Sequence, residues 1–231
     1  MIDTYISIDL ETTGLNPAED RIIEVGAVLV EDGIIKDTLD ILINPGIHIP
    51  AKITEITGIT DAMVKDAPQL GDVIHSIFGF LGNYIILGHN VQFDYSFLKK
   101  AASDFNIPFA RNGIDTCAIA KKILPDIKSR SLEYLCGYFN IKNTHHRALA
   151  DAYSALEVYK RLCLISYSDS YVKELHYRIP RQEPATDKQK AFLRRLIAGY
   201  NIIYDKDIEG LTKSMASKEI DGILSVYGIR H

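Results

Sequence analysis

The sequence has few cysteines and no long apolar run, and each absence excludes a class of protein. Its three cysteines, Cys117, Cys136 and Cys163, are widely spaced and form no C-x-x-C pair. We therefore expect reduced thiols in a cytoplasmic protein, and neither a disulfide framework nor a zinc site. No apolar stretch approaches the ~20 residues that cross a bilayer, so we expect no membrane partner. No signal peptide is visible, because Met1 leads almost directly into an apolar segment.

An excess of positive charge is also lacking. The chain carries 26 Lys and Arg against 30 Asp and Glu, a formal net charge of −4. A protein that grips long duplex DNA through many phosphates needs a basic surface. An enzyme that holds only a few terminal nucleotides, with metal ions neutralising them, does not. The charge balance therefore argues against strong autonomous DNA binding and leaves nuclease chemistry open.

Two carboxylates lie close together near the N-terminus, at Asp9 and Glu11. The β-branched and aromatic residues of the segment 5–9 predict a strand that ends at Asp9, and residues 12–14 supply turn chemistry just after Glu11. Residues two apart in a strand project from the same face, so the two like charges would lie side by side. That arrangement is costly unless a cation joins them. A solvated strand end is the alternative explanation for an isolated pair of this kind.

Two further acidic residues follow at predicted helix starts. Asp94 lies in a Gly-His-Asn-x-x-Phe-Asp segment, after the apolar strand 84–87 and near the start of a predicted helix 93–105. Asp151 lies close to the start of another apolar-periodic helix. An acidic residue in a first turn can simply complement the helix dipole, but four carboxylates together supply the hard oxygen ligands that Mg²⁺ and Mn²⁺ prefer. The candidate metal ligands are Asp9, Glu11, Asp94 and Asp151.

The predicted elements indicate an α/β fold. Asp32-Gly33 separates the predicted strands 22–30 and 33–43 and is a strong hairpin signal. An antiparallel hairpin followed by alternating strands and helices predicts a mixed sheet flanked by helices. With the short strand 113–115 the sheet would have five strands, and the segment 161–179 is expected to extend the last helix of this domain.

The three acidic segments resemble, in order and spacing, the DEDDh branch of the DnaQ-like 3′–5′ exonucleases, the proofreading-exonuclease family. The matching motifs are Asp9-x-Glu11 with its Thr-Thr-Gly, Asp94 in Gly-His-Asn-x-x-Phe-Asp, and His146-x4-Asp151. The likeness spans roughly residues 1–165, with no departure at an expected catalytic position. The resemblance implies a ribonuclease-H-like fold.

The resemblance also implies a two-metal mechanism. Two Mg²⁺ or Mn²⁺ ions would clamp the scissile phosphodiester, one activating the attacking water and the other stabilising the leaving 3′ oxygen. Asp9 would bridge both ions, Glu11 and Asp151 would complete the first site, and Asp94 would support the second. His146 would be the general base, since an imidazole titrates near neutrality.

Several neighbouring residues are compatible with two roles. His89 can hydrogen-bond the backbone of a tight turn or support the substrate, and Phe93 can be core or can stack on the terminal base. The turn after Glu11 can end a strand or place amides and hydroxyls near the 3′ end. His145 can be a loop residue or an auxiliary phosphate contact. The candidate substrate-binding residues are Thr12, Thr13, Gly14, His89, Asn90 and Phe93.

We expect from this that the chain is a metal-dependent 3′–5′ exonuclease that releases nucleoside 5′-monophosphates from single-stranded or frayed 3′ ends. DNA proofreading or repair is the expected role. RNA trimming is the alternative within the enzymes, because ribonucleases of the same family carry the same five residues and discrimination at the 2′ hydroxyl depends on other contacts. The alternative that is not an enzyme is a recruitment module that acts through residues 186–231.

A composition shift near residue 180 predicts a second unit. Residues 179–185 contain two prolines and no helical period, so we expect a linker between an exonuclease domain, 1–178, and a small helical hairpin, 186–231. Thr186 and Asp187 can cap its first helix, and Ser214 or Ser217 its second. A hairpin this small has little core of its own.

The first of these helices is rich in cations. Its basic residues are Lys188, Lys190, Arg194 and Arg195. A solvated polar face explains such a cluster. A contact surface for single-stranded nucleic acid, or for a polymerase, helicase or other replication or repair protein, is the functional alternative.

Overall fold

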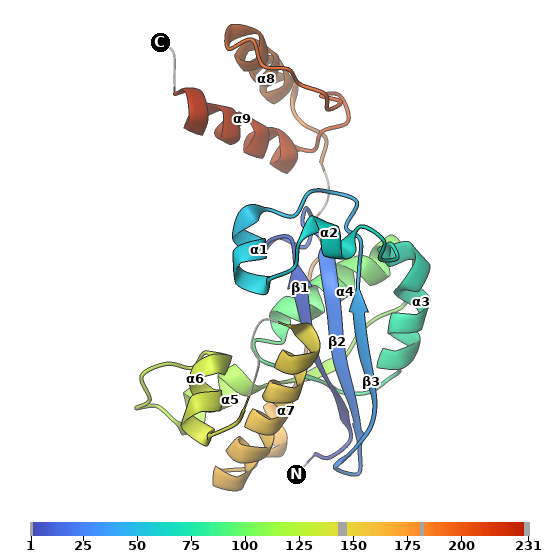
Figure 1. Ribbon diagram of the computed structural model, residues 1–231, viewed down its shortest axis with the longest axis vertical. Coiled ribbons are helices and arrows are strands. Elements are labelled where there is room, and N and C mark those ends of the chain that lie inside the picture. The colour runs from blue at the N-terminus through green and yellow to red at the C-terminus, as the bar shows by residue number, and fades with distance from the viewer. Residues whose placement is uncertain (1, 143–146, 181–182, 229–231) are drawn as a thin grey trace. The chain divides into compact units, whose positions relative to one another are not determined.

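The computed structural model describes residues 2–142, 147–180 and 183–228 (Figure 1). The chain divides into two compact units, Met1–Ile179 and Pro180–His231. The first unit contains a sheet with helices on both faces, and the second is a helical hairpin.

The first unit is organised around a six-stranded mixed sheet with the order β3-β2-β1-β4-β5-β6. The parallel pairs are β1–β4 and β4–β5, and the other neighbours are antiparallel. This is the expected mixed sheet flanked by helices. The strands are β1 (Tyr5–Thr12), β2 (Ile22–Glu31), β3 (Ile34–Leu42), β4 (Ile86–Gly88), β5 (Asn112–Asp115) and β6 (Val172–Glu174).

The expected number of five strands was wrong, because β6 adds a sixth. The last helix of this unit ends at Ile165, so only the first five residues of the segment 161–179 extend it, and β6 pairs with β5 through Val172 opposite Ile114. A strand of three residues is too short to show an alternating pattern. Pairing with an otherwise open sheet edge decides its conformation, and that edge is distant in the sequence.

The β2–β3 connection is the tight hairpin that the sequence predicts. Asp32 and Gly33 both adopt positive φ, 52° and 73°. Positive φ at both central residues is the requirement of the type I′ turn, whose twist matches that of the flanking strands. The turn pairs Glu31 with Ile34 and Val30 with Ile35, and the register then shifts by one residue between Val30 and Leu29.

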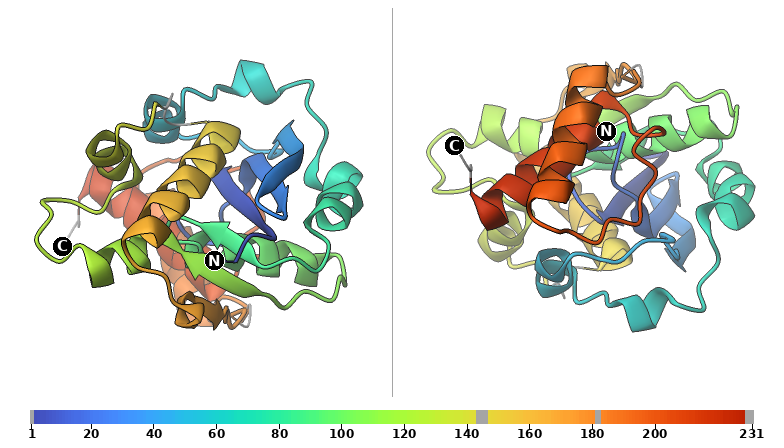
Figure 2. Two further views of the ribbon diagram at one scale, coloured as in Figure 1. Left: turned by 90° about the horizontal axis from the view of Figure 1, so that it is seen from below. Right: turned by 90° about the horizontal axis from the view of Figure 1, so that it is seen from above.

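The two faces of the sheet pack against different helices. One core contains Ile6, Ile8 and Leu10 with residues of α3 and α4, and the other contains Tyr5 with residues of α5, α6 and α7. Figures 1 and 2 show α7 on one side of β1 and β2 and α3 on the other. The helices of this unit are α1 (Ala51–Thr57), α2 (Asp61–Val64), α3 (Leu70–Leu81), α4 (Gln92–Asp104), α5 (Thr116–Ile123), α6 (Leu132–Phe139) and α7 (Ala148–Ile165).

The second unit consists of α8 (Asp187–Gly199) and α9 (Lys213–Tyr227). As expected, Thr186 caps α8, and it does so in a capping box with Gln189. The helix α9 begins at Lys213, earlier in the chain than the sequence suggested. Its N-cap is therefore Thr212, and not Ser214 or Ser217. The apolar core of the hairpin comprises Ala185, Leu193, Leu196, Leu211, Ala216, Ile220 and Ile223.

Part of the segment expected to be a linker packs on this hairpin. The Ala185 side chain is buried, and its N–H donates to the carbonyl of Leu211 at 2.8 Å. Pro184 pairs with Thr212, and Glu183 binds Lys213. The C-terminal hairpin therefore includes residues 183–185 as part of its fold.

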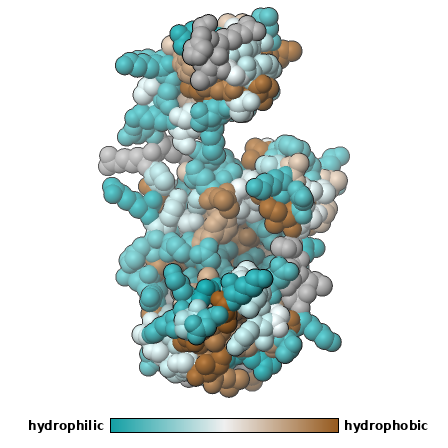
Figure 3. Space-filling model, turned by 90° about the vertical axis from the view of Figure 1, so that its left-hand side faces the viewer, coloured by the Kyte–Doolittle hydropathy of each residue, from teal (hydrophilic) through white to brown (hydrophobic). Residues whose placement is uncertain are grey.

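The surface shown in Figure 3 is mixed. Hydrophobic side chains lie there in small groups separated by hydrophilic ones. Small apolar groups of this kind are normal on the surface of a folded protein. Among the described residues, no helix combines the length and the apolarity needed to cross a membrane.

Candidate active site

The alternation of side chains along β1 places its two carboxylates on the α7 face of the sheet. Tyr5 lies in the core that faces α7, and the Ser7 hydroxyl donates to the carbonyl of Ala152 in α7 at 2.6 Å. Asp9 and Glu11 continue the same face, because side chains repeat every second residue. The strand therefore directs both carboxylates toward the start of α7.

The start of α7 brings a third carboxylate to this point. Asp151 lies in the first turn of α7 and is 8% exposed. Asp9, Glu11 and Asp151 each have an oxygen within 4.8 Å of the others. Three of the four candidate metal ligands thus converge within the reach of a single cation.

The fourth carboxylate arrives from α4. Asp94 is 2% exposed, in the first turn of that helix. One of its oxygens accepts a hydrogen bond from the backbone N–H of Leu10, at 3.0 Å. This bond attaches Asp94 to β1 at the residue between Asp9 and Glu11. Asp94 is not among the three closest carboxylates, but its charge acts on Asp9.

The electrostatics of this group favour a bound cation. Burial raises the pKa of Asp9 well above its ordinary value, and the neighbouring Asp94, Glu11 and Asp151 raise it further. Burial, with the charge of Asp151, also raises the pKa of Glu11 to about 7. Carboxylates that repel one another in this way are stabilised in their ionised form by a divalent metal, which prefers oxygen ligands. The donor set thus fits Mg²⁺ or Mn²⁺.

The expected general base, His146, lies outside the described residues, in the segment 143–146. The structure describes Arg147, which immediately follows it, and Asp151 five residues further on. The role of His146 stays a prediction.

In the turn where β1 ends, the hydroxyls of Thr12 and Thr13 form hydrogen bonds with the backbone. Thr12 and Thr13 are buried, at 7% and 3% exposure. The Thr12 hydroxyl donates to the carbonyl of Gly14 at 2.6 Å, and the Thr13 hydroxyl accepts from the N–H of Arg21 at 2.9 Å. A Cβ on Gly14 would lie 2.5–2.6 Å from the Asp20 carboxylate, so a larger residue there would displace the Asp20 side chain. These contacts support a structural role for this turn, beside the expected substrate role.

His89 and Asn90 connect the loop before α4 to the start of α5. The Nδ1 of His89 lies 2.9 Å from the Thr116 hydroxyl, and burial lowers the pKa of His89, so that the ring is neutral near pH 7. Asn90 has a φ of 64°, and its N–H donates to Asp115 at 3.1 Å. These bonds hold the loop that precedes Phe93 and Asp94.

Phe93 is half-buried on α4. Its ring centroid lies 5.1 Å from that of Phe97, and it packs at the border of the core beneath α3 and α4. The ring is therefore in contact with the core and partly open to solvent. Both the core role and the stacking role are compatible with this position.

Sequence reasoning missed a buried carboxylate beside the candidate site, Glu24 on β2. It is fully buried and lies opposite Glu11 in the β1–β2 register. Arg147 donates to it from two nitrogens, at 2.8 and 2.6 Å. The available signal was a single charged residue inside an otherwise apolar strand, a pattern that calls for a buried partner.

A family model described as "Exonuclease" matches residues 6–159, which include α4 and most of β1 and α7, with all four carboxylates. The chain belongs to this exonuclease family. The expected resemblance to the proofreading exonucleases is confirmed, and the protein is a hydrolase of the exonuclease class.

Two bacterial relatives illustrate the match. The chain is 35% identical over 161 residues to the DNA polymerase III subunit epsilon of Aquifex aeolicus, covering 69% of this chain and 80% of that protein. It is 37% identical over 159 residues to the PolC-type DNA polymerase III of Clostridium perfringens, covering 68% of this chain and 11% of the relative. The chain thus spans about a tenth of the length of the PolC-type relatives.

A solved structure supports the fold as well. Exonuclease X, determined in complex with 5′-overhanging duplex DNA, is 27% identical, with a TM-score of 0.59 over 72% of this chain and 96% of that one. The expected ribonuclease-H-like fold is therefore confirmed.

Proposed function

We propose that this exonuclease is a divalent-metal-dependent enzyme that removes nucleotides from the 3′ end of DNA and releases nucleoside 5′-monophosphates in proofreading or repair. The observation that carries the proposal is the convergence of Asp9, Glu11 and Asp151 within 4.8 Å, with Asp94 bound to the same strand. An all-oxygen site of this kind suits metal-assisted phosphodiester hydrolysis.

The residues have distinct roles in this proposal. Asp9, Glu11 and Asp151 would hold a divalent metal ion, and Asp94 would support metal binding beside Asp9. When bound, such ions supply a polarised water and neutralise the charge that develops on the leaving oxygen. His146 accepts the proton of the attacking water. The half-buried ring of Phe93 offers a face to the terminal base.

DNA as the substrate is supported by the relatives. The two bacterial relatives are named as DNA polymerase III proteins, and Exonuclease X was solved with duplex DNA. An acidic protein that grips only a few terminal nucleotides is consistent with the net charge of −4. The role also places the enzyme in the cytoplasm, with the DNA of the cell.

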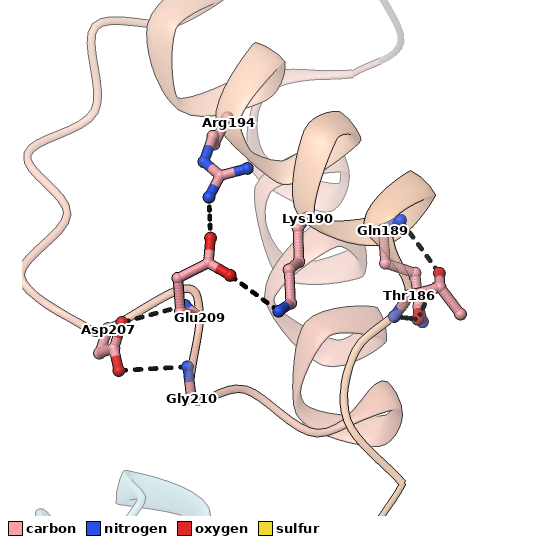
Figure 4. A network of polar contacts seen from close by, with 7 residues as sticks. All are labelled: Thr186, Gln189, Lys190, Arg194, Asp207, Glu209 and Gly210. Carbon is pink, nitrogen blue, oxygen red and sulfur yellow. Dashed lines mark hydrogen bonds and ion pairs between the residues drawn. The ribbon is translucent and has the colours of Figure 1, made fainter.

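The C-terminal unit is proposed to contact a polymerase or another replication or repair protein. Figure 4 shows that Glu209 binds both Lys190, at 2.9 Å, and Arg194. Two of the four basic residues expected on α8 thus form ion pairs within the hairpin itself. Arg195 stacks on Phe192, 4.9 Å from the ring centroid. This surface is less available to phosphates than its sequence suggests, which favours a protein partner.

The function is tested with short 5′-labelled DNA and RNA strands of identical sequence. They are incubated with the wild-type protein, His146→Ala and the neighbouring control His145→Ala, in Mg²⁺, Mn²⁺ or EDTA. We expect a ladder that shortens from the 3′ end, is faster on DNA, requires metal, and is lost only in His146→Ala. Degradation in EDTA, or equal loss in both variants, would contradict the proposal. Faster hydrolysis of RNA would assign the enzyme to RNA trimming.

The role of the C-terminal unit is tested by ending the chain after Ile179. The first unit has hydrophobic cores of its own, so we expect the shortened protein to hydrolyse short oligonucleotides at the wild-type rate and to lose co-purification with the replicative polymerase. Loss of hydrolysis on a folded first unit would instead assign the hairpin to the enzyme.

A further inference from the structure

The start of α7 is attached to β2 by a buried carboxylate. One oxygen of Glu24 accepts from Nε and Nη2 of Arg147, at 2.8 and 2.6 Å. The other oxygen accepts from the backbone N–H of Ala148, at 3.0 Å. Both oxygens of Glu24 are therefore used to bind two consecutive residues at the N-terminus of α7, where backbone N–H groups have no partner within the helix.

The sheet also lets α7 approach more closely here than a side chain would permit. A Cβ on Gly26 would lie 2.0 Å from the backbone N of Leu149 and 2.1 Å from the carbonyl carbon of Ala148. Gly26 is the partner of Asp9 in the β1–β2 register, just as Glu24 is the partner of Glu11. The attachment thus lies on the strand that borders the two β1 carboxylates.

Asp151 is connected to this attachment by a single helical turn. Its N–H donates to the carbonyl of Arg147 at 3.0 Å. A shift of Arg147 would therefore move Asp151 relative to β1, although Glu24 and Arg147 need not touch the metal. Groups that orient metal ligands commonly change metal affinity by roughly 10–100-fold when they are removed.

We propose that Glu24 and Arg147 form a positioning pair that holds the first turn of α7 on β2, and so sets the place of Asp151 in the metal site. The inference rests on the proposed metal-dependent function. It assigns a role to two residues outside the metal ligands and the general base.

Positioning and simple charge predict opposite effects for Arg147. The guanidinium lies near three acidic residues, Glu24, Asp40 and Glu11. If Arg147 acted only through its positive charge, its removal would make the site more negative and would tighten the binding of a cation. If it holds Asp151 in place, its removal weakens metal binding. The sign of the change therefore separates the two explanations.

The experiment measures metal binding without nucleic acid. Wild type, Arg147→Gln, Arg147→Lys and Glu24→Ala are freed of metal with EDTA, dialysed, and titrated with MnCl₂ while the melting temperature is followed. We expect the concentration for half-maximal stabilisation to rise by about 10–100-fold in Arg147→Gln and Glu24→Ala. Arg147→Lys keeps the charge without the planar two-nitrogen contact and should recover only part of the loss.

The matched control is Val28→Ala. Val28 is fully buried on β2 in the core that faces α7, so its truncation loosens the same strand without touching the polar attachment. It should lower the melting temperature and leave the manganese midpoint within about twofold of wild type. Should Glu24→Ala fail to fold, Arg147→Gln decides alone, because its side chain is 45% exposed.

The outcomes separate this inference from the proposed function. A wild-type protein with neither metal-dependent stabilisation nor hydrolysis would refute the proposed function. A metal-stabilised, active wild type whose Arg147→Gln variant binds Mn²⁺ as tightly as wild type, or more tightly, would overturn the positioning role alone. A midpoint shift in Val28→Ala as large as that in Glu24→Ala would also overturn it, because general loosening would then suffice.

Discussion

Glu11 and Glu209 are the same residue type in opposite surroundings. Glu11, on β1, lies among other carboxylates, and burial with their charge raises its pKa to about 7. Glu209, in the C-terminal hairpin, is 61% exposed and binds Lys190 and Arg194, which lower its pKa (Figure 4). In the second unit Lys190 and Arg194 compensate the charge of Glu209, whereas the carboxylates of the first unit lie together in a cluster whose donor set fits a divalent metal. Charges that the protein itself compensates least are typical of functional sites.

The largest expected effect comes from removing Asp9, whose pKa is raised by all three of the other candidate metal ligands. Asp9→Ala should lower the rate of hydrolysis by about 10³-fold or more, since it removes the central metal ligand of the proposed site. The metal-free protein should keep its melting temperature or gain stability, because a buried like charge is gone. Initial rates on a labelled strand and thermal unfolding in EDTA measure both effects.

The control for that variant is Asp3→Ala, an exposed acid just before the same strand, which should retain the wild-type rate. Even a tenth of the wild-type rate in Asp9→Ala would show that Asp9 does not carry the role proposed for it.

Asp94→Asn should have the next largest effect. The amide oxygen can still accept from the N–H of Leu10, so α4 stays attached to β1 while the charge is lost. We expect the rate to fall roughly 10–100-fold, with higher stability in EDTA than wild type. Asp104→Asn, an exposed acid at the end of the same helix, should change neither. A normal rate in Asp94→Asn would exclude Asp94 from metal binding.

The pH dependence of stability should differ with and without metal. In EDTA, the pKa of Glu11 in the folded protein is raised to about 7. The Glu11 side chain therefore makes its full contribution to the free energy of unfolding below pH ~4.5, and this contribution is lost as the pH rises to about 7. Thermal unfolding in EDTA should therefore show a loss on the order of 2 kcal/mol across that interval. Added Mg²⁺ should stabilise the protein more at pH 8 than at pH 5.

Glu11→Gln tests the assignment of this effect, because it should flatten the profile in EDTA. A profile that stays steep in Glu11→Gln would assign the titration to other carboxyls, and an unchanged profile in Mg²⁺ would contradict metal binding at this group.

The smallest effect is expected in the hairpin. Glu209→Gln breaks two solvent-exposed ion pairs, which contribute little because water and salt screen them. Hydrolysis of a short oligonucleotide should be unchanged, and the melting temperature should move by no more than about 2 °C. A marked fall in hydrolysis would mean that the hairpin participates in the active site. It would contradict the expectation that Glu11 is needed for hydrolysis and Glu209 is not.

The sequence by itself determined the parts of this protein that depend on local patterns. The alternation in β1 predicted that Asp9 and Glu11 share a face, Asp32-Gly33 predicted the hairpin, and helical periods placed Asp94 and Asp151 near helix starts. These signals work because strand and helix periods and turn conformations are properties of a few neighbouring residues.

Only the tertiary structure decided the rest. Glu24 meets Arg147 across 123 positions of the chain, and β6 forms because β5 offers an unpaired edge. The 4.8 Å convergence of Asp151 with β1 depends on the close approach of α7 over Gly26. Such contacts join elements that are distant in the sequence, so no local pattern contains them. Packing decides which charges are buried together, and that burial gives Asp9 and Glu11 their raised pKa and their fit to a divalent metal.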